Sequence, residues 1–165
     1  MYDTEVAMRA SLILCDYAQV HAGKLYVTGG GVNLIGTPSV NPPHPISIHA
    51  AVILTVPWQA HNQAHTLRVR LEDEDGTVVP IATVQTGQKV EDEDKGSYIA
   101  QFNVGRPPIM QAGDENPVPV VVYLGPAVPK VGGYKVSVSV DGAELATARF
   151  RVMHFAQENL QLTVQ

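Results

Sequence analysis

Apolar and polar residues alternate one by one along much of this chain, which is the pattern of a β-strand with one buried face. The clearest stretch is 134–140, in which a tyrosine and three valines share one face while a lysine and two serines share the other. Asp141 and Gly142 follow, and such a pair accepts the positive φ angles of a tight hairpin turn. Alternation resumes over 146–152, so the sequence predicts a β-hairpin here.

A second hairpin is predicted by the same reasoning. Leucine and valine alternate with charged residues over 67–72, and Asp75 with Gly76 supplies a turn. The returning strand is expected at 78–84. It contains Pro80, which cannot donate a ladder hydrogen bond, so this strand should lie at a sheet edge or carry a bulge.

The remaining strands are read from shorter alternating or continuous apolar runs. They are predicted at 8–15, 24–35, 46–56, 98–104 and 118–124. The last run is apolar on both faces, which is typical of a central strand covered on both sides. A short turn near 58–62 is the one helical feature expected. Together with the Pro-rich and Gly-rich connectors, the pattern predicts an all-β fold: a two-sheet antiparallel β-sandwich, immunoglobulin-like or C2-like, of about 8–9 strands.

Length and composition favour one globular domain over 1–165, with 155–165 as a C-terminal arm. A net charge of −5 argues against binding to nucleic acid or to an anionic membrane surface, which both need excess lysine and arginine. No apolar run approaches the ~18 residues of a membrane-spanning helix, and the first residues lack the pattern of a secretory signal. With a single cysteine and no internal disulfide, a cytoplasmic protein is expected.

The strand order also predicts where the loops lie. Each strand of a sandwich crosses its full height, so successive loops alternate between the two ends. Counting nine strands gathers four histidines and the acidic run 91–94 at one end, and leaves His44 with the acidic turn 72–75 at the other. The four histidines are His21, His61, His65 and His154.

These residues suggest a metal site. His61 and His65 are four positions apart, and His21 with Asp92 and Asp94 could complete a ligand set if the loops converge. The alternative is that they are solvated loop residues, because no cysteine ligand or HExxH pattern accompanies them.

Other signs of chemistry are weaker still. Cys15 ends an apolar strand beside Asp16, and both burial and a carboxylate raise a thiol pKa, so a structural role is favoured over a catalytic one. The glycines at 29–31 lack the Lys-Ser/Thr of a phosphate loop, and GxSxG is absent. No nucleophile and base pair is visible. The sequence therefore predicts a protein that is not an enzyme and uses no cofactor.

Several stretches resemble a known but uncharacterised family. Residues 12–35 read LILCDYAQVHAGKLYVTGGGVNLI. This stretch resembles the opening of a family of small bacterial all-β proteins, which have a hydrophobic strand, an Asp-aromatic/small-Ala-Gln segment, Gly-Lys-Leu-Tyr and a glycine run. Residues 56–76, VGRPP at 104–108 and the final VDG hairpin are similar to later blocks of that family. The resemblance supports the fold. It implies no catalytic residue, because the family has no assigned activity.

Two hypotheses about function follow. The first is a non-catalytic β-sandwich that acts through protein contacts, as a homo-oligomer or as a component of a larger assembly. It rests on the missing catalytic constellation, the Pro-rich loops and an arm that could pair with a neighbour. The alternative is a ligand-binding or metal-binding module that uses the histidine-rich loop end.

Overall fold

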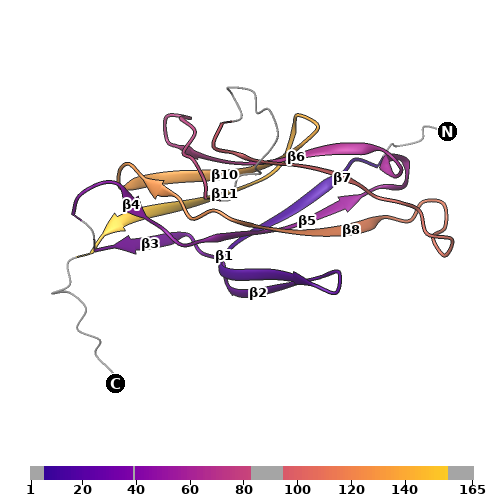
Figure 1. Cartoon of the computed structure of the whole chain (residues 1–165), viewed down its shortest axis with the longest axis horizontal. Coiled ribbons are helices and arrows are strands. Elements are labelled where there is room, and N and C mark those ends of the chain that lie inside the picture. Colours follow the sequence, from indigo (N-terminus) through magenta and orange to yellow (C-terminus); the bar gives the residue numbers. More distant parts are fainter. Residues whose placement is uncertain (1–5, 39, 83–94, 156–165) are drawn as a thin grey trace, which may run out of the picture.

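A computed structural model describes residues 6–38, 40–82 and 95–155 of the chain. Within these residues the protein is all-β, as the alternation predicts: eleven strands, one short 3-10 turn, η1 (Trp58–Ala60), and no α-helix (Figure 1). The turn falls where the sequence places its one helical feature. None of the helical segments in this described part is long and apolar enough to cross a membrane.

The strands form two larger sheets and one small one. The four-stranded sheet has the order β2-β1-β5-β8, and its strands are β1 (Arg9–His21), β2 (Lys24–Gly30), β5 (His49–Val56) and β8 (Asn116–Tyr123). The five-stranded sheet has the order β3-β11-β10-β6-β7, made of β3 (Leu34–Thr37), β11 (Ala143–His154), β10 (Gly132–Val140), β6 (Ala64–Asp73) and β7 (Tyr98–Asn103). A small sheet pairs β4 (His44–Pro45) with β9 (Ala127–Val128).

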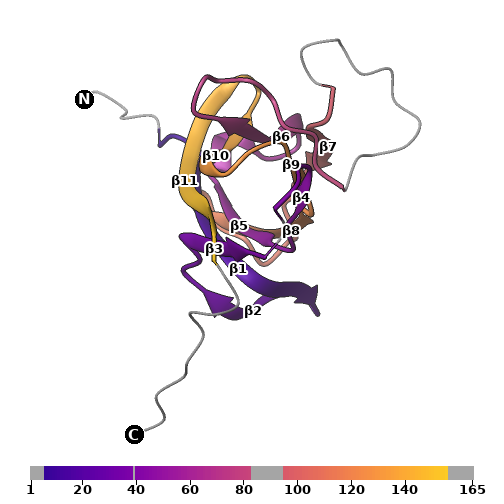
Figure 2. The same ribbon diagram turned by 90° about the vertical axis from the view of Figure 1, so that its left-hand side faces the viewer.

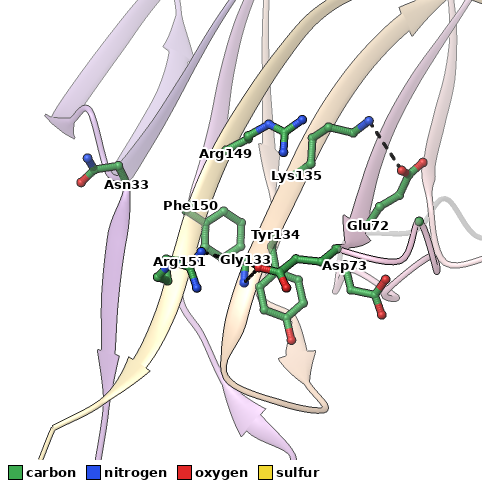
Figure 3. Close-up of a pocket in the computed structure, with 11 residues that line it drawn as sticks. Asn33, Glu72, Asp73, Gly133, Tyr134, Lys135, Arg149, Phe150 and Arg151 are labelled. Carbon is green, nitrogen blue, oxygen red and sulfur yellow. Dashed lines mark hydrogen bonds and ion pairs between the residues drawn. The ribbon is translucent and has the colours of Figure 1, made fainter.

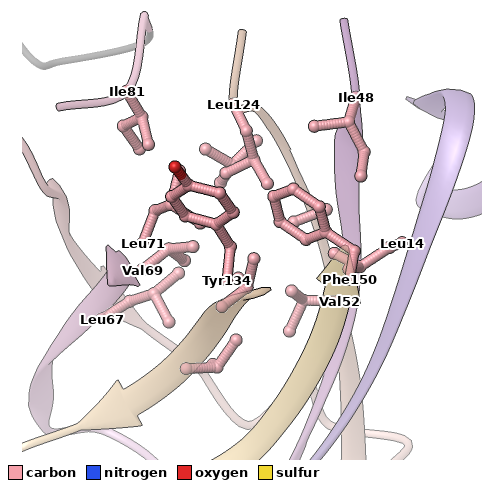
Figure 4. Packing of buried hydrophobic residues seen from close by; sticks show 14 of the residues in the cluster. Leu14, Ile48, Val52, Leu67, Val69, Leu71, Ile81, Leu124, Tyr134 and Phe150 are labelled. Atoms are coloured by element: carbon pink, nitrogen blue, oxygen red, sulfur yellow. The ribbon is translucent and has the colours of Figure 1, made fainter. Parts of the chain in front are cut away.

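One hydrophobic core lies between the two larger sheets. The four-stranded sheet contributes alternate residues of β5, among them Val52 and Leu54, and the five-stranded sheet contributes those of β6 and β10, among them Val69 and Val138; all four are fully buried. Tyr134 and Phe150 stack at a ring distance of 5.6 Å within this core (Figure 4). The residues that alternate in the sequence are therefore the ones that fill the core.

The hairpin predicted around Asp141 and Gly142 is confirmed. β10 and β11 pair antiparallel from Val140 with Ala143 to Gly132 with Val152. Asp141 has φ 50° and Gly142 has φ 83°, the positive values expected of this pair. A register shift beside Val138 marks a β-bulge.

The strand predicted at 24–35 is wrong as a single element. The chain forms β2 in one sheet, crosses at 31–33, and then forms β3 in the other sheet. β3 pairs parallel with β11, so the fold is not wholly antiparallel. This split, together with the short β4 and β9, raises the strand number above the eight or nine expected. A row of glycines lets the backbone turn from one sheet to the other, a role that an alternation pattern does not reveal.

Two other strand predictions need correction. The turn at Asp75 and Gly76 is present, but the described part of the returning segment, 78–82, makes one bridge, between Glu72 and Val78, and β6 pairs with β10 and β7 instead. Residues 83 and 84 of the predicted strand lie outside the described residues. β8 is an edge strand of its sheet and not a central one. On its second face Val121 packs against the β1–β2 hairpin, while Tyr123 on the same face is 39% exposed.

The β1–β2 hairpin forms a layer of its own. β1 is long: its first half pairs with β5 up to Cys15, and its second half pairs only with β2. Figures 1 and 2 show the strand bending so that the hairpin lies beneath the outer face of the four-stranded sheet. A small second cluster joins them, made of Cys15, Ala18 and Ala51 with Leu25 and Val121 packed against it.

Several loops lie at the opposite end of the molecule from the one that the strand count predicts. β6 begins and β10 ends at one end of the molecule, which holds His61 and His65. β11 runs from that end to the other, so His154 lies at the opposite end, with its ring 5.3 Å from that of His44. The loop at 125–133 also lies there, because β9 pairs with β4. The count failed at the strands that were misread, since each one moves every later loop to the opposite end.

Candidate functional site

His65 is a buried structural link between two parts of the chain. Its Nδ1 lies 2.7 Å from Asp141 Oδ2 and its Nε2 lies 2.7 Å from the Ala60 carbonyl oxygen. Both partners are oxygen acceptors, so only the doubly protonated imidazolium can donate to both. Burial disfavours that charge, but the bonds to Ala60 and Asp141 outweigh it and raise the pKa of His65. The ring thus ties the turn after β5 to the β10–β11 hairpin.

His61 has a similar local role. Its Nε2 donates to the Val56 carbonyl oxygen at 3.1 Å, and the side chain is buried. Its ring lies 5.8 Å from that of Trp58, and the guanidinium of Arg106 lies 3.8 Å from the centre of the Trp58 ring while donating to the Trp58 carbonyl oxygen. These contacts hold η1 in place at this end of the molecule.

The metal hypothesis gains no ligand set from the described residues. His61 and His65 bind backbone and carboxylate oxygens as above, and His21 lies in the β1–β2 hairpin with its ring 6.4 Å from Tyr26. No group of three metal-binding side chains occurs within 6–38, 40–82 and 95–155. Asp92 and Asp94 lie outside the described residues, so a site that includes them stays a prediction.

Cys15 is fully buried under the β1–β2 hairpin. Its Sγ faces the His49 carbonyl oxygen at 3.6 Å. Burial raises the pKa of the thiol, and the neighbouring Asp16 carboxylate raises it further. This environment agrees with the structural role expected from the sequence.

Cys15 should therefore be protected from alkylation. We expect the native protein to react with iodoacetamide near neutral pH at least about 100-fold more slowly than the urea-unfolded protein, because the thiol is both inaccessible and protonated. Mass spectrometry of timed samples measures the rates. Equal rates would show that the hairpin does not cover Cys15.

A charged groove of about 330 Å³ lies on the five-stranded sheet (Figure 3). It is lined by acids from β6 and the turn that follows it, and by bases from β10 and β11. Glu72 Oε2 lies 3.7 Å from Lys135 Nζ, and Glu74 Oε1 lies 3.6 Å from Arg151 Nη2 and accepts from the Gly133 N–H at 2.9 Å. Arg149 also lines the groove, and its basic side chain makes no ion pair with another described residue.

The charged side chains of this groove form ion pairs and hydrogen bonds between neighbouring strands, which favours a structural role over a ligand site. Each acid is already matched by a base or a backbone N–H, and ion pairs of this exposure contribute about 0–1 kcal/mol each. A ligand would have to break these pairs to bind. The groove therefore does not mark the site of a function by itself.

The most distinctive surface is that of the β1–β2 hairpin. Half of the large hydrophobic residues that the described structure leaves exposed gather on the hairpin or beside its base. They form what we call the hairpin surface: Ile13, Tyr17, Val20, Tyr26, Val27 and Tyr123, which are 37–51% exposed. A concentration of exposed apolar side chains on one element is typical of an interaction site, because exposing them to water is unfavourable.

The register of the hairpin places these side chains on both of its faces. Tyr17 and Tyr26 share one face, and Val20 and Val27 share the other, on which Ala18 and Leu25 pack toward the sheet. Each face of the hairpin therefore presents apolar side chains to solvent.

An aromatic row joins the hairpin to strands β5 and β8 of the same sheet. The rings of Tyr17 and His49 meet edge to face at 5.3 Å, and His49 lies 4.9 Å from Tyr123. His49 Nδ1 lies 3.0 Å from the Asp16 carbonyl oxygen, which fixes the ring between the two tyrosines. Tyrosines held in this way lose little conformational freedom when a partner covers them.

Sequence reasoning missed this surface. The sequence predicts that the first strand ends at Cys15, which leaves Tyr17 and Val20 in a loop, whereas β1 continues to His21. Tyr26 and Val27 fall in the strand predicted at 24–35, where alternation would bury one side. A signal was present in the run 17–28, which carries tyrosine or valine on both faces and no charged residue besides Lys24.

The structure thus defines an all-β protein of two larger sheets and a hairpin that lies beneath one of them. A family model described as a family of unknown function (DUF6941) matches residues 10–153, so the chain belongs to that family. The match is consistent with the uncharacterised family that the sequence predicts. No curated protein matches the chain.

Proposed function

We propose that this protein is a non-catalytic β-sandwich that acts through protein contacts, as a homo-oligomer or as part of a larger assembly. The observation that carries the proposal is the hairpin surface, which holds exposed tyrosines and valines on a hairpin outside the main core. Tyrosine is enriched in protein interfaces because its ring is apolar while its hydroxyl group remains satisfied by water or a partner.

The class of fold is part of the same proposal. Two sheets with a shared core support a two-sheet sandwich of the immunoglobulin-like or C2-like type. The parallel β3–β11 pair and the bend of β1 are departures from the simplest form of that type. A module of this architecture presents its function on loops, edges and added hairpins, since its core is fully used for packing.

The arrangement of titratable groups supports a non-catalytic role. His65 and Asp141 have the spacing of a histidine and carboxylate pair, but the second ring nitrogen is bonded to the Ala60 carbonyl and cannot act as a base. Cys15 is buried and its pKa is raised, which disfavours the thiolate that a nucleophile needs. We accordingly propose that the partner is a protein, and not a nucleic acid, a membrane or a cofactor, in line with the net charge of −5.

The test removes the tyrosines of the hairpin surface. In the Tyr17→Ser, Tyr26→Ser variant we expect association to weaken by roughly 100-fold or more, because each ring buried in an interface contributes about 1.5–3 kcal/mol. Size-exclusion chromatography with light scattering measures the self-association, and pull-down from lysate measures capture of another protein.

The matched control carries two apolar-to-serine changes elsewhere. Val40 and Ile109 are 81% and 88% exposed and lie outside the hairpin surface. The Val40→Ser, Ile109→Ser variant should associate like the unmodified protein. A monomeric unmodified protein that captures nothing, or equal behaviour of the two variants, would contradict the proposal.

A further inference from the structure

The chain carries a strand pattern beyond the described fold. Residues 159–165 read NLQLTVQ, in which Leu160, Leu162 and Val164 alternate with polar residues. One-by-one alternation over this length is the pattern of a strand with one buried face. Such a segment needs an apolar partner surface, and the polar face would remain in water.

Phe155, the last described residue, is held against strand β3. Phe155 packs its ring against Gly36 of β3, where no room remains even for a Cβ atom, and its N–H faces the Thr37 carbonyl oxygen at 3.3 Å. The residues 156–165 follow directly from this anchor. Ten extended residues span at most about 33–36 Å, which is enough to reach a neighbouring molecule.

β2 is the strand edge best suited to receive this segment. It lies at the edge of its sheet, no described strand pairs with its outer side, and its seven residues match the length of 159–165. Valine and tyrosine on its two faces stand 37–49% exposed. The edge strand β8 contains Pro117 and Pro119, which cannot donate to an added strand, and β3 has only four residues. The remaining edge of the larger sheets, β7, carries none of the large hydrophobic residues that the described structure leaves exposed.

We propose that residues 159–165 of one copy add as a strand to the outer edge of β2 of a second copy and cover the part of the hairpin surface that β2 carries. This inference rests on the proposed function and names the occupant of that surface. Backbone hydrogen bonds along β2 supply the pairing, and the apolar face of the segment packs on the valines or the tyrosines of the hairpin. Reciprocal exchange between two copies gives a closed dimer.

The experiment changes the two faces of the segment separately. The triple variant Leu160→Asp, Leu162→Asp, Val164→Asp places charge on the apolar face. We expect it to lower the association constant of the full chain by roughly 100-fold or more, because three apolar contacts are lost. The control Gln161→Asp, Thr163→Asp, Gln165→Asp adds the same charge to the polar face and should associate within about tenfold of the unmodified chain. Light scattering and sedimentation equilibrium give the masses and constants.

A second measurement identifies the receiving edge. A fluorescein-labelled peptide of residues 156–165 should bind the chain truncated after Phe155, and binding should fall at least about tenfold when Val27→Lys charges the β2 edge. Dichroism of the variants checks that they fold. Equal peptide binding with and without the β2 change would overturn the inference.

The outcomes separate this inference from the proposed function. If the two triple variants associate alike while the Tyr17→Ser, Tyr26→Ser variant does not associate, the hairpin surface binds a partner but the C-terminal segment is not its occupant. If the unmodified chain is a monomer that captures another protein through the hairpin surface, the second copy is ruled out and the proposed function stands. Association that depends on the apolar face of 159–165 and on β2 supports both.

Discussion

Replacing Phe150 by alanine should lower the free energy of unfolding by about 3–5 kcal/mol. Phe150 is 3% exposed and stacks on Tyr134 within the core shared by the two larger sheets, near Leu14 and Val52 (Figure 4). Removing the ring loses its transfer free energy and leaves a cavity that strands in two sheets cannot close together. Because domains of this size have a total stability of about 5–15 kcal/mol, this one change removes a large part of it.

The loss is measured by urea unfolding followed by far-ultraviolet dichroism. Phe150→Leu is the control, since it keeps most of the apolar volume and should cost less than half as much. The exposed substitution Ile109→Ala, at a residue that is 88% exposed, should change stability by no more than about 0.5 kcal/mol. A Phe150→Ala cost below about 1 kcal/mol would mean that the two sheets do not share this core.

The second large effect concerns Asp141, and Asp141→Ala should cost about 1.5–3 kcal/mol near pH 6. Its carboxylate accepts from the Thr66 N–H at 2.9 Å and faces His65 Nδ1 at 2.7 Å, so the change leaves a buried ring nitrogen and a backbone donor without their partner. The residue also has φ 50°, a conformation that aspartate and asparagine tolerate better than alanine.

The same pair should make stability depend on pH in two directions. The pKa of His65 is raised above its ordinary 6.5, so its contribution is full below that value and is lost as the pH rises through the folded-state pKa. The pKa of Asp141 is lowered below 3.8 by the His65 and Thr66 bonds, which outweigh burial, so its contribution is full above 3.8 and is lost as the pH falls through the lower value. The pair therefore stabilises the fold most between these limits.

Asp141→Asn is the matched variant for this effect. It can keep the Thr66 bond and the turn conformation while it removes the charge that favours the imidazolium. We expect a smaller loss, about 1 kcal/mol, and a flatter decline of stability as the pH rises above 6.5 than in the unmodified protein. Urea unfolding across that range measures it. An unchanged slope would show that His65 is not charged in the folded state.

Much of the architecture could be read from the amino-acid pattern. Alternation over 134–140 and 146–152 with an Asp-Gly turn predicts the β10–β11 hairpin, and the apolar face of 46–56 is buried as expected. A period of two is a local property, since neighbouring side chains of a strand must point to opposite faces. The structural role of Cys15 was also within reach, because it depends on burial and on an adjacent carboxylate.

The candidate sites were harder to predict from the sequence, because they depend on which distant segments of the chain come into contact. His65 and Asp141 are 76 positions apart, and no local pattern pairs them. The strand count places His154 beside His61 and His65, and this is wrong because the described part of the segment predicted as a strand at 78–84 is not one of the strands that cross between β6 and β7. The hairpin surface required a bend in β1 near Cys15, where the Leu14 carbonyl oxygen accepts from both Gly31 and Val32.

The amino-acid sequence alone thus determined the secondary-structure class, the principal hairpin and most residues of the core, because these follow from side-chain alternation and turn chemistry within a few positions. Only the tertiary structure decided that β2 and β3 enter different sheets, that β8 is an edge, and that the β1–β2 hairpin exposes its tyrosines. The reason is that sheet order and the exposure of a strand face depend on contacts between distant segments, which compete with one another and leave no periodic trace in the chain.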